Sequence, residues 1–260
     1  MRRRMMVWAV ALVLAGMLGT SSLYAQAAQS GSGASAQSDA KQPNMSTEKG
    51  KETTAAAVSV LSQAGDLVRY AQENESAVAM LAAVQMIERV QVQDNPQRVG
   101  TKKSGLQNEG EQVKEEKKGN TPAPTFDTQQ LLAQAKPWAK GNQNLLALID
   151  AESAKAKSSA GGTLGSTRGA ITHRDSVNAR SYDDYKISFY GGEVARIAIV
   201  GDGDTDVDLY VYDENGHLIA KDDDRTAECV VSFVPRWTGP FRVRVVNNGY
   251  VYSNYLLLTN

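Results

Sequence analysis

The spacing of apolar residues changes once along this chain, from a helical period to a strand period. In residues 53–93, apolar side chains recur every three or four positions, as on one face of a helix. The polar residues Glu73–Glu75 divide this stretch, which predicts an antiparallel helical hairpin. Its alanine-rich faces favour close helix–helix packing over a membrane-active or partner-binding role.

A second helical pair follows further along the chain. Asp127 is expected to cap its first helix, Pro137 to kink or end it, and Gly141 to separate the two helices. The intervening residues 94–125 are charged and interrupted by Pro and Gly, which predicts a solvated loop. We therefore expect a helical region over residues 53–157 that contains this loop.

From residue 171 onward the apolar period becomes two. Short runs rich in β-branched and aromatic residues are separated by Gly, Asp, Asn and Pro. They are YKISF, VARIAIV, DLYVYD, HLIA, CVVSFV, FRVRVV and NYLLLT. With a further strand near residues 176–179, the count is seven or eight, and no helical segment intervenes. The fold class predicted for the whole chain is α+β and multidomain, with N-terminal helical hairpins followed by an antiparallel, jelly-roll-like β-sandwich over residues 171–260.

Two segments lack core-forming residues. Residues 28–52 are rich in Ser, Gly, Ala and Gln and are expected to form a disordered tether. Residues 158–170 have the Gly/Ser composition of a flexible linker. We take this linker as the main domain boundary.

The N-terminus has the layout of a secretory signal peptide. Arg2–Arg4 precede the uncharged apolar run Met5–Leu18, and Ala25-Gln26-Ala27 is a small-x-small cleavage pattern. The apolar run is shorter than the ~20 residues that a membrane span needs. Residues 1–27 are therefore expected to be removed on export, leaving a periplasmic or secreted protein without a stable membrane span.

Charge and cysteine content narrow the classes of partner and site. The formal net charge is −1, and residues 171–260 hold 14 Asp and Glu against 9 Lys and Arg, which gives −5. This balance argues against nucleic acid or anionic membranes as partners. Cys229 is the only cysteine, so neither an intrachain disulfide nor a Cys-based zinc site can form. It alternates with Val231 and Phe233, which predicts a buried small side chain.

Residues from about 180 to 260 resemble a known family. The motifs are GDGDTDVDLYVYDENG, CVVSFVPRWTGPFRVRVVNNG and the terminal YSNYLLLTN. Together they look like the bacterial pre-peptidase C-terminal domain, a secreted β-sandwich that usually follows a secreted hydrolase. The resemblance implies the fold and export. Helices and linkers, rather than a protease, precede the matched stretch here. Some members of the family bind calcium, and some adhere to matrix or polysaccharide.

The acidic stretch at residues 201–216 is the main candidate for chemistry. Its alternating carboxylates would share one face of an extended chain, and hard oxygen ligands at this density suit Ca²⁺. The candidate ligands are Asp202, Asp204, Asp206, Asp208 and Asp213. An EF-hand is excluded because Val207 stands where that loop needs glycine, and Asp213 where it needs a bidentate glutamate.

The alternative for this stretch is turn chemistry at the end of a strand. Asn215-Gly216 suits a tight hairpin, and Asp is common in turns. A second acidic group, Asp222–Asp224, follows the next predicted strand and would join a calcium site only if the two loops meet. Calcium and turn chemistry both remain open, while a glycosidase-like carboxylate pair is disfavoured because exposed turns perturb pKa values little.

No catalytic constellation emerges from the remaining residues. The chain has two histidines, His173 and His217, and no Gly-x-Ser-x-Gly motif that would present a nucleophilic serine. Trp237, Tyr250 and Tyr252 flank turns, where they would form either the edge of the core or an aromatic patch for sugar or protein.

These patterns lead to one functional hypothesis and one alternative. We expect an exported, non-enzymatic binding or assembly module whose β-sandwich contacts protein or glycan and is stabilised by calcium if the carboxylates converge. The helical region would then serve oligomerisation or docking. The alternative is an accessory or processing component of a secreted hydrolase (peptidase) system.

Overall fold

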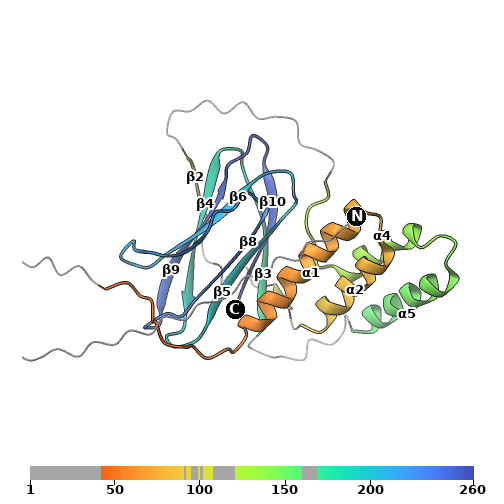
Figure 1. The fold of residues 1–260 in the computed structure, drawn as a ribbon, viewed down its shortest axis with the longest axis horizontal. Coiled ribbons are helices and arrows are strands. Elements are labelled where there is room, and N and C mark those ends of the chain that lie inside the picture. The colour runs from red at the N-terminus through yellow and green to blue at the C-terminus, as the bar shows by residue number, and fades with distance from the viewer. Residues whose placement is uncertain (1–41, 91, 95–98, 100–101, 108–120, 160–168) are drawn as a thin grey trace, which may run out of the picture. The chain divides into compact units, whose positions relative to one another are not determined.

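Two five-stranded sheets and a set of helices make up the described part of the chain (Figure 1). The computed structural model describes residues 42–90, 92–94, 99, 102–107, 121–159 and 169–260. The expected signal peptide, and the expected tether as far as residue 41, lie outside the described residues. None of the helices within the described ranges is long and apolar enough to cross a membrane.

The helices form where the apolar period predicts them. They are α1 (Ala55–Glu73), α2 (Ala77–Glu88), α4 (Thr128–Trp138) and α5 (Gln143–Ser159). The side chain of Asp127 accepts a hydrogen bond from the Gln130 backbone N–H, so the predicted cap of α4 is confirmed. Pro137 lies one residue before the end of that helix, and Gly141, at φ 86°, turns the chain toward α5.

The strands are β1 (Val92–Asp94), β2 (Lys103–Leu106), β3 (Ala170–Val177), β4 (Ser181–Phe189), β5 (Ala195–Gly201), β6 (Val207–Tyr212), β7 (Leu218–Asp222), β8 (Glu228–Phe233), β9 (Gly239–Asn247) and β10 (Ser253–Thr259). The first sheet has the order β1-β3-β10-β5-β8, and the second has the order β2-β4-β9-β6-β7. Every neighbouring pair is antiparallel except β1 and β3. Eight of these strands, β3 to β10, come from the stretch of period two.

The main core lies between the two sheets. Alternate residues of β9 point inward, namely Phe241, Val243 and Val245, and all three are fully buried. Phe241 also meets Phe189 and Phe233 in an aromatic cluster with ring centroids 4.9–5.8 Å apart. The arginines between the inward residues of β9 face outward, as the alternation predicts.

The helices cover the other face of the first sheet. Leu61 and Val68 of α1 belong to the same buried cluster as Val200 of β5 and Leu256 of β10. Strands β5 and β10 are thus buried on both faces, which explains their nearly continuous apolar sequences. Gly65 allows the close approach of α1, because a Cβ there would lie 2.7 Å from a methyl group of Val200. No helix of the described residues packs on the outer face of the second sheet in the same way.

The expectation of a solvated loop over residues 94–125 is corrected in part. Strand β2 comes from this stretch and pairs with the edge of the second sheet along β4. Its sequence, Lys103–Leu106, has no apolar alternation, so the strand depends on backbone pairing with β4 and on the side chains around it. Tyr182 of β4 lies directly against Gly105, where any larger residue would collide with the ring.

The last residues of the expected tether are also ordered. Asn44 is fully buried, and its Oδ1 accepts hydrogen bonds from the backbone N–H groups of Arg236 (2.9 Å) and Trp237 (3.0 Å). Further along, Lys51 forms a parallel bridge with Glu193. This polar segment is held by directed hydrogen bonds, which composition does not reveal.

Candidate functional site

The acidic stretch does not form one face of an extended strand. Strand β6 begins only at Val207, and the preceding residues form a bent loop. Asp202, at the start of this loop, is 3% exposed. Its Oδ2 accepts hydrogen bonds from the backbone and side-chain N–H groups of Asn254 at 2.8 and 2.9 Å. This carboxylate therefore joins the loop to the start of β10.

Asp206 and Asp208 lie together at the end of the sandwich where β6 begins. Both accept hydrogen bonds from Asn248 Nδ2, at 3.4 Å and 2.8 Å. Burial, together with the neighbouring charges of Asp206 and Asp223, raises the pKa of Asp208. Asp204, in the same loop, accepts a hydrogen bond from Thr121. Asp206 and Asp208 repel each other, and the Asn248 amide satisfies both in part.

Asp213 lies at the other end of β6. The six residues of that strand separate it from Asp206 by roughly 20 Å at about 3.3 Å per residue. The carboxylate accepts backbone hydrogen bonds from Asn44 (3.0 Å), Asn215 (2.9 Å) and His217 (2.9 Å). Burial opposes ionisation of Asp213, but these bonds and the His217 ring outweigh it and lower the pKa. Its role is to hold the turn between β6 and β7.

The five carboxylates therefore do not fit a single calcium site. Asp213 is too far from the rest, and Asp202 already accepts bonds from β10. The residues that the structure describes contain no group of three or more His, Cys, Asp or Glu side chains arranged to hold a metal ion. Among the Asp222–Asp224 group, Asp222 accepts a hydrogen bond from the Val230 backbone N–H, and Asp224 accepts one from Thr226.

The three candidate aromatic residues do not form one patch. Trp237 precedes β9, while Tyr250 and Tyr252 follow it. The nine residues of β9 therefore separate them by roughly 25 Å. Trp237 is 37% exposed, and its Nε1 donates to Glu214 at 2.9 Å. It thus lies at the same end of the sandwich as the β6–β7 turn.

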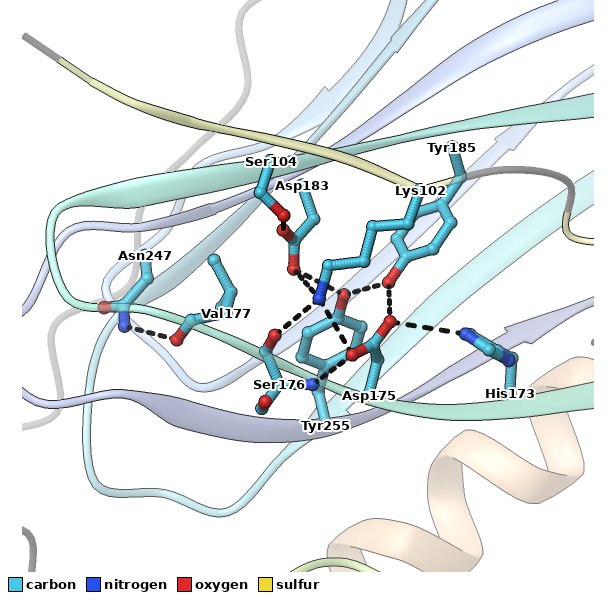
Figure 2. A network of polar contacts seen from close by, with 10 residues as sticks. All are labelled: Lys102, Ser104, His173, Asp175, Ser176, Val177, Asp183, Tyr185, Asn247 and Tyr255. Carbon is cyan, nitrogen blue, oxygen red and sulfur yellow. Dashed lines mark hydrogen bonds and ion pairs between the residues drawn. The ribbon is translucent and has the colours of Figure 1, made fainter. Parts of the chain in front are cut away.

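A network of polar side chains joins β3, β4 and β10 and includes Lys102, Asp175, Asp183, Tyr185 and Tyr255 (Figure 2). Lys102 Nζ lies 2.8 Å from Asp175 and 3.1 Å from Asp183. The hydroxyl of Tyr185 donates to Asp175 at 2.8 Å, and that of Tyr255 donates to Asp183 at 3.1 Å. The residues come from β3, β4, β10 and the segment before β2, which the network fastens to the sandwich.

The electrostatics of this network favour structure over catalysis. Burial alone would lower the pKa of Lys102, but its hydrogen bonds to Asp175 and Asp183 outweigh burial and raise the pKa. Burial and the nearby carboxylates raise the pKa values of Tyr185 and Tyr255. The lysine thus stays a cation and the tyrosines stay protonated, so none of them is prepared to act as a nucleophile or base at neutral pH.

Cys229 and the two histidines have structural partners. Cys229 is 1% exposed, and its Sγ donates to the Val207 carbonyl at 2.9 Å. Burial, followed by nearby carboxylates, raises its pKa. His173 Nε2 lies 3.4 Å from Asp175, and His217 Nδ1 lies 2.9 Å from Asp213.

The outer face of the second sheet carries a different chemistry. Cross-strand register sets its side chains in rows. One row is Lys103, Asp184, Arg244, Tyr210 and Lys221, and the next is Lys186, Arg242, Tyr212 and Leu218. We call these two rows the basic face. Five of its nine side chains are cationic and one is a carboxylate.

Tyrosine rings and guanidinium groups stack on this face. The Arg244 guanidinium lies 3.8 Å from the ring centroid of Tyr182, and that of Arg242 lies 4.4 Å from the ring of Tyr212. Arg244 also makes two hydrogen bonds of 2.7 Å to Asp184. The second row has no such carboxylate.

A groove lies over part of the basic face. Its volume is about 920 Å³. Its lining holds three cations and three carboxylates, namely Lys103, Lys186, Arg242, Asp184, Asp213 and Glu214. The sequence predicts the solvent-facing side of β9, but it does not predict this groove. The alternation of Arg242 and Arg244 was visible in the sequence, whereas the opposition of Lys186 and Arg242 depends on strand pairing.

Comparison with known proteins does not assign this chain to a family. No protein-family model and no curated protein sequence matches the chain. Among solved structures, the chain is similar to a de novo designed double-stranded β-helix determined in solution by NMR. The identity is 13%, the match covers 34% of this chain and 97% of that one, and the TM-score is 0.23. A likeness at this TM-score is too weak to bear on fold or function.

Proposed function

We propose that this chain is an exported, non-enzymatic binding or assembly module that contacts a protein or glycan through its β-sandwich. The observation that carries the proposal is the basic face. The helices cover the outer face of the first sheet, whereas the second sheet presents cations and tyrosines outward. Tyrosine and arginine, which combine an apolar body with a polar tip, are enriched at binding surfaces.

The strand order supports a finer assignment of the fold. Strands β3 to β10 run β3-β10-β5-β8 in one sheet and β4-β9-β6-β7 in the other. In a jelly roll, eight strands likewise divide between two sheets and cross from one to the other. We propose this topology, and with it membership of the pre-peptidase C-terminal type, to which the motifs of residues 180–260 point.

A pull-down from the cell-envelope fraction tests the binding function. The mature protein should retain an envelope component, and the double variant Tyr210→Ser with Tyr212→Ser should lose it, because both rings lie on the basic face. Tyr70→Ser is the matched control, since Tyr70 is 54% exposed on α1. Equal retention by all three proteins would contradict a role for this face.

Export has its own test. Mass spectrometry of the protein from its native host should find an N-terminus near Ala28, as the Ala25-Gln26-Ala27 pattern predicts. An intact Met1 in the soluble periplasmic fraction would overturn the signal-peptide hypothesis.

A further inference from the structure

A charged residue interrupts the face of the first sheet that the helices cover. On that face Val200, Leu256 and Leu258 belong to the buried cluster shared with the helices. Arg174 of β3 is directly opposite Leu256 in the β3–β10 register, so its side chain leaves the sheet on the same face. The arginine is nevertheless exposed, and its Nη2 donates to Thr125, in the segment before α4, at 2.9 Å. The helical cover is therefore open at Arg174.

A cleft lies at this opening, between the segment that leads into α4 and the first sheet. Its volume is about 460 Å³, and small-molecule sites typically measure about 300–1,000 Å³. Val92, Phe126 and Leu256 supply apolar walls. The polar groups of the lining are two threonine hydroxyls, one guanidinium and one carboxylate. Apolar walls with a few polar groups that orient the ligand are typical of small-molecule sites.

A buried hydroxyl in this cleft has an unused hydrogen. Thr125 is 4% exposed, and its Oγ1 accepts hydrogen bonds from Arg174 Nη2 at 2.9 Å and from the Asp127 backbone N–H at 3.1 Å. Within the described ranges, no group accepts the hydrogen of this hydroxyl. A buried donor without an acceptor costs free energy, so the cleft favours a ligand oxygen beside Thr125.

Arg174 offers further donors at the same place. It bonds to the neutral Thr125 hydroxyl and forms no ion pair with any residue that the structure describes. A guanidinium has five N–H donors in a planar fork that matches a carboxylate. Because Arg174 Nη2 and Thr125 Oγ1 are 2.9 Å apart, one carboxylate can accept from both residues. Two kinds of donor therefore converge on one acceptor position.

The lining also holds one group of opposite charge. Among its described residues, Arg174 and Asp127 are the two that carry charge. Asp127 caps α4 through a 3.1 Å bond from the Gln130 N–H to its Oδ1, which leaves lone pairs on both carboxylate oxygens. One cation and one carboxylate select neither an anion nor a cation. They match a ligand that carries both charges.

The two charges are close together but not paired. Arg174 through its side chain and Asp127 through its backbone N–H both bond to Thr125 Oγ1, yet the two side chains form no ion pair. A ligand with a carboxylate and an ammonium on the same carbon fits this arrangement. We propose that the cleft binds an α-amino acid with an apolar side chain.

Each part of such a ligand has a partner in the cleft. Its carboxylate accepts from Arg174 and Thr125, its ammonium donates to Asp127, and its side chain packs against Phe126 and Leu256. This binding activity goes beyond the proposed function, because the cleft lies on the first sheet and the basic face lies on the second.

Isothermal titration of the mature protein with L-leucine tests the inference. The wild type should bind, and Arg174→Gln should bind at least about tenfold more weakly, since that factor corresponds to one lost hydrogen bond to a charged group. Arg174→Lys keeps the charge but loses the planar fork, so its affinity should be intermediate. Arg225→Gln removes another exposed arginine, on the loop between β7 and β8, and should bind like the wild type.

Ligand analogues test whether both charges are recognised. Isocaproate lacks the ammonium group of leucine and leucinamide lacks its carboxylate, so each should bind at least about tenfold more weakly than leucine. Asp127→Asn retains the cap of α4, because asparagine caps helices as well as aspartate does. This variant should weaken the binding of leucine but not that of isocaproate. Equal affinity of the wild type for leucine and isocaproate would overturn the assignment of a zwitterion.

The hydroxyl of Thr125 has its own pair of variants. Thr125→Ser keeps the hydroxyl and should bind leucine nearly as the wild type does, whereas Thr125→Val should bind it about tenfold more weakly. L-Serine should bind the wild type more weakly than L-leucine, because it leaves the apolar walls uncovered. Equal affinity for serine and leucine would contradict the role of Phe126 and Leu256.

The remaining outcomes are separable. A folded Arg174→Gln protein that binds leucine like the wild type would overturn the inference. If that variant does not fold, the response of Asp127→Asn to leucine and isocaproate decides. If neither leucine nor phenylalanine binds the wild type at millimolar concentration, the inference fails. Retention of an envelope component through Tyr210 and Tyr212 is independent of that result, so the proposed function can stand without the cleft.

Discussion

Aspartate plays two opposite roles at the two ends of β6. At one end, Asp213 accepts several N–H donors, which lower its pKa. At the other end, burial and like charges raise the pKa of Asp208. The same residue type therefore stabilises the fold at one end of the strand and opposes it at the other.

One substitution made at both positions should have opposite effects. Asp213→Asn should destabilise the protein by about 2 kcal/mol, the value of hydrogen bonds to a charged acceptor. Asp208→Asn should stabilise it by about 0.5 kcal/mol, because the amide still accepts from Asn248 and removes a repelled charge. Chemical denaturation at pH 7 measures both values.

The pH dependence follows from the two pKa shifts. The folded pKa of Asp213 is lowered, so its stabilisation is present above the unfolded pKa of about 3.9 and is lost as the pH falls through the folded value. The folded pKa of Asp208 is raised, so its penalty is full above that raised value and vanishes below the unfolded one. Effects of the same sign at both positions would contradict these opposite roles.

Calcium should have little effect on stability. Asp202 and Asp213 are committed to other partners, and no shared metal site exists within the described ranges. We expect millimolar calcium to leave the melting temperature of the full chain unchanged, with magnesium as the comparison. A rise that disappears in Asp206→Asn would instead establish a cation site, since a ligand that binds only the native state stabilises it.

At the scale of elements, the close packing of α1 on the first sheet fixes which residues α1 can carry on its buried face. Gly65 faces Val200 across this contact, with no room for a side chain. Gly65→Leu should therefore destabilise the protein by about 1–3 kcal/mol through overpacking, although leucine favours a helix more than glycine does. Gln63→Leu, on the exposed side of α1, is the control and should leave the melting temperature nearly unchanged. A stable Gly65→Leu protein would show that α1 does not pack closely on β5.

The same contact contains a pH-sensitive group. Arg69 of α1 lies 2.6 Å from Glu228 of β8, while burial and the nearby Asp66 raise the pKa of Glu228 to about 8. Because the folded pKa is raised, the stability it contributes is full below the unfolded pKa of about 4.3 and is lost as the pH rises through about 8.

Glu228→Gln should remove much of this pH dependence. The melting temperature of the wild type should fall between pH 5 and pH 9, a range that includes the raised pKa. That of the variant should fall less. Glu73→Gln is the matched control, because Glu73 pairs with the same arginine but is 66% exposed. Parallel curves for the wild type and Glu228→Gln would argue against proton uptake at this contact.

At the scale of the molecule, the linker determines where a protease cuts, and the packing of the helices on the first sheet determines whether the two pieces stay together. Protease should cut first within residues 158–170, because a Gly/Ser composition predicts few contacts; residues 160–168 of this expected linker lie outside the described part of the chain. The cut should leave a fragment of roughly ninety residues on a denaturing gel. The two pieces should still elute together under native conditions, because α1 packs on the first sheet and β2 belongs to the second. Early cleavage inside residues 190–250 would contradict the boundary, and separation of the native pieces would contradict the packing.

The sequence predicted best those features that depend on residues a few positions apart, such as strand alternation and helix limits. The period-two runs predicted β4 to β10, whereas the strand expected near residues 176–179 is β3 and already begins at Ala170. The Asp127 cap, Pro137 and Gly141 marked the limits of α4 and α5. It was least informative about Asn44, β2 and Lys102. These are polar residues whose order depends on partners more than 70 positions away.

The sequence by itself determined the two classes of element, their order and the inward face of strands such as β9, because periodicity and turn residues act within a few positions. Only the tertiary structure decided that α1 covers the first sheet, that Asp213 lies apart from Asp206, and that Lys186 faces Arg242. Each of these depends on which strands become neighbours. That choice is made by the summed burial of both sheets and the helices, and no local pattern records it.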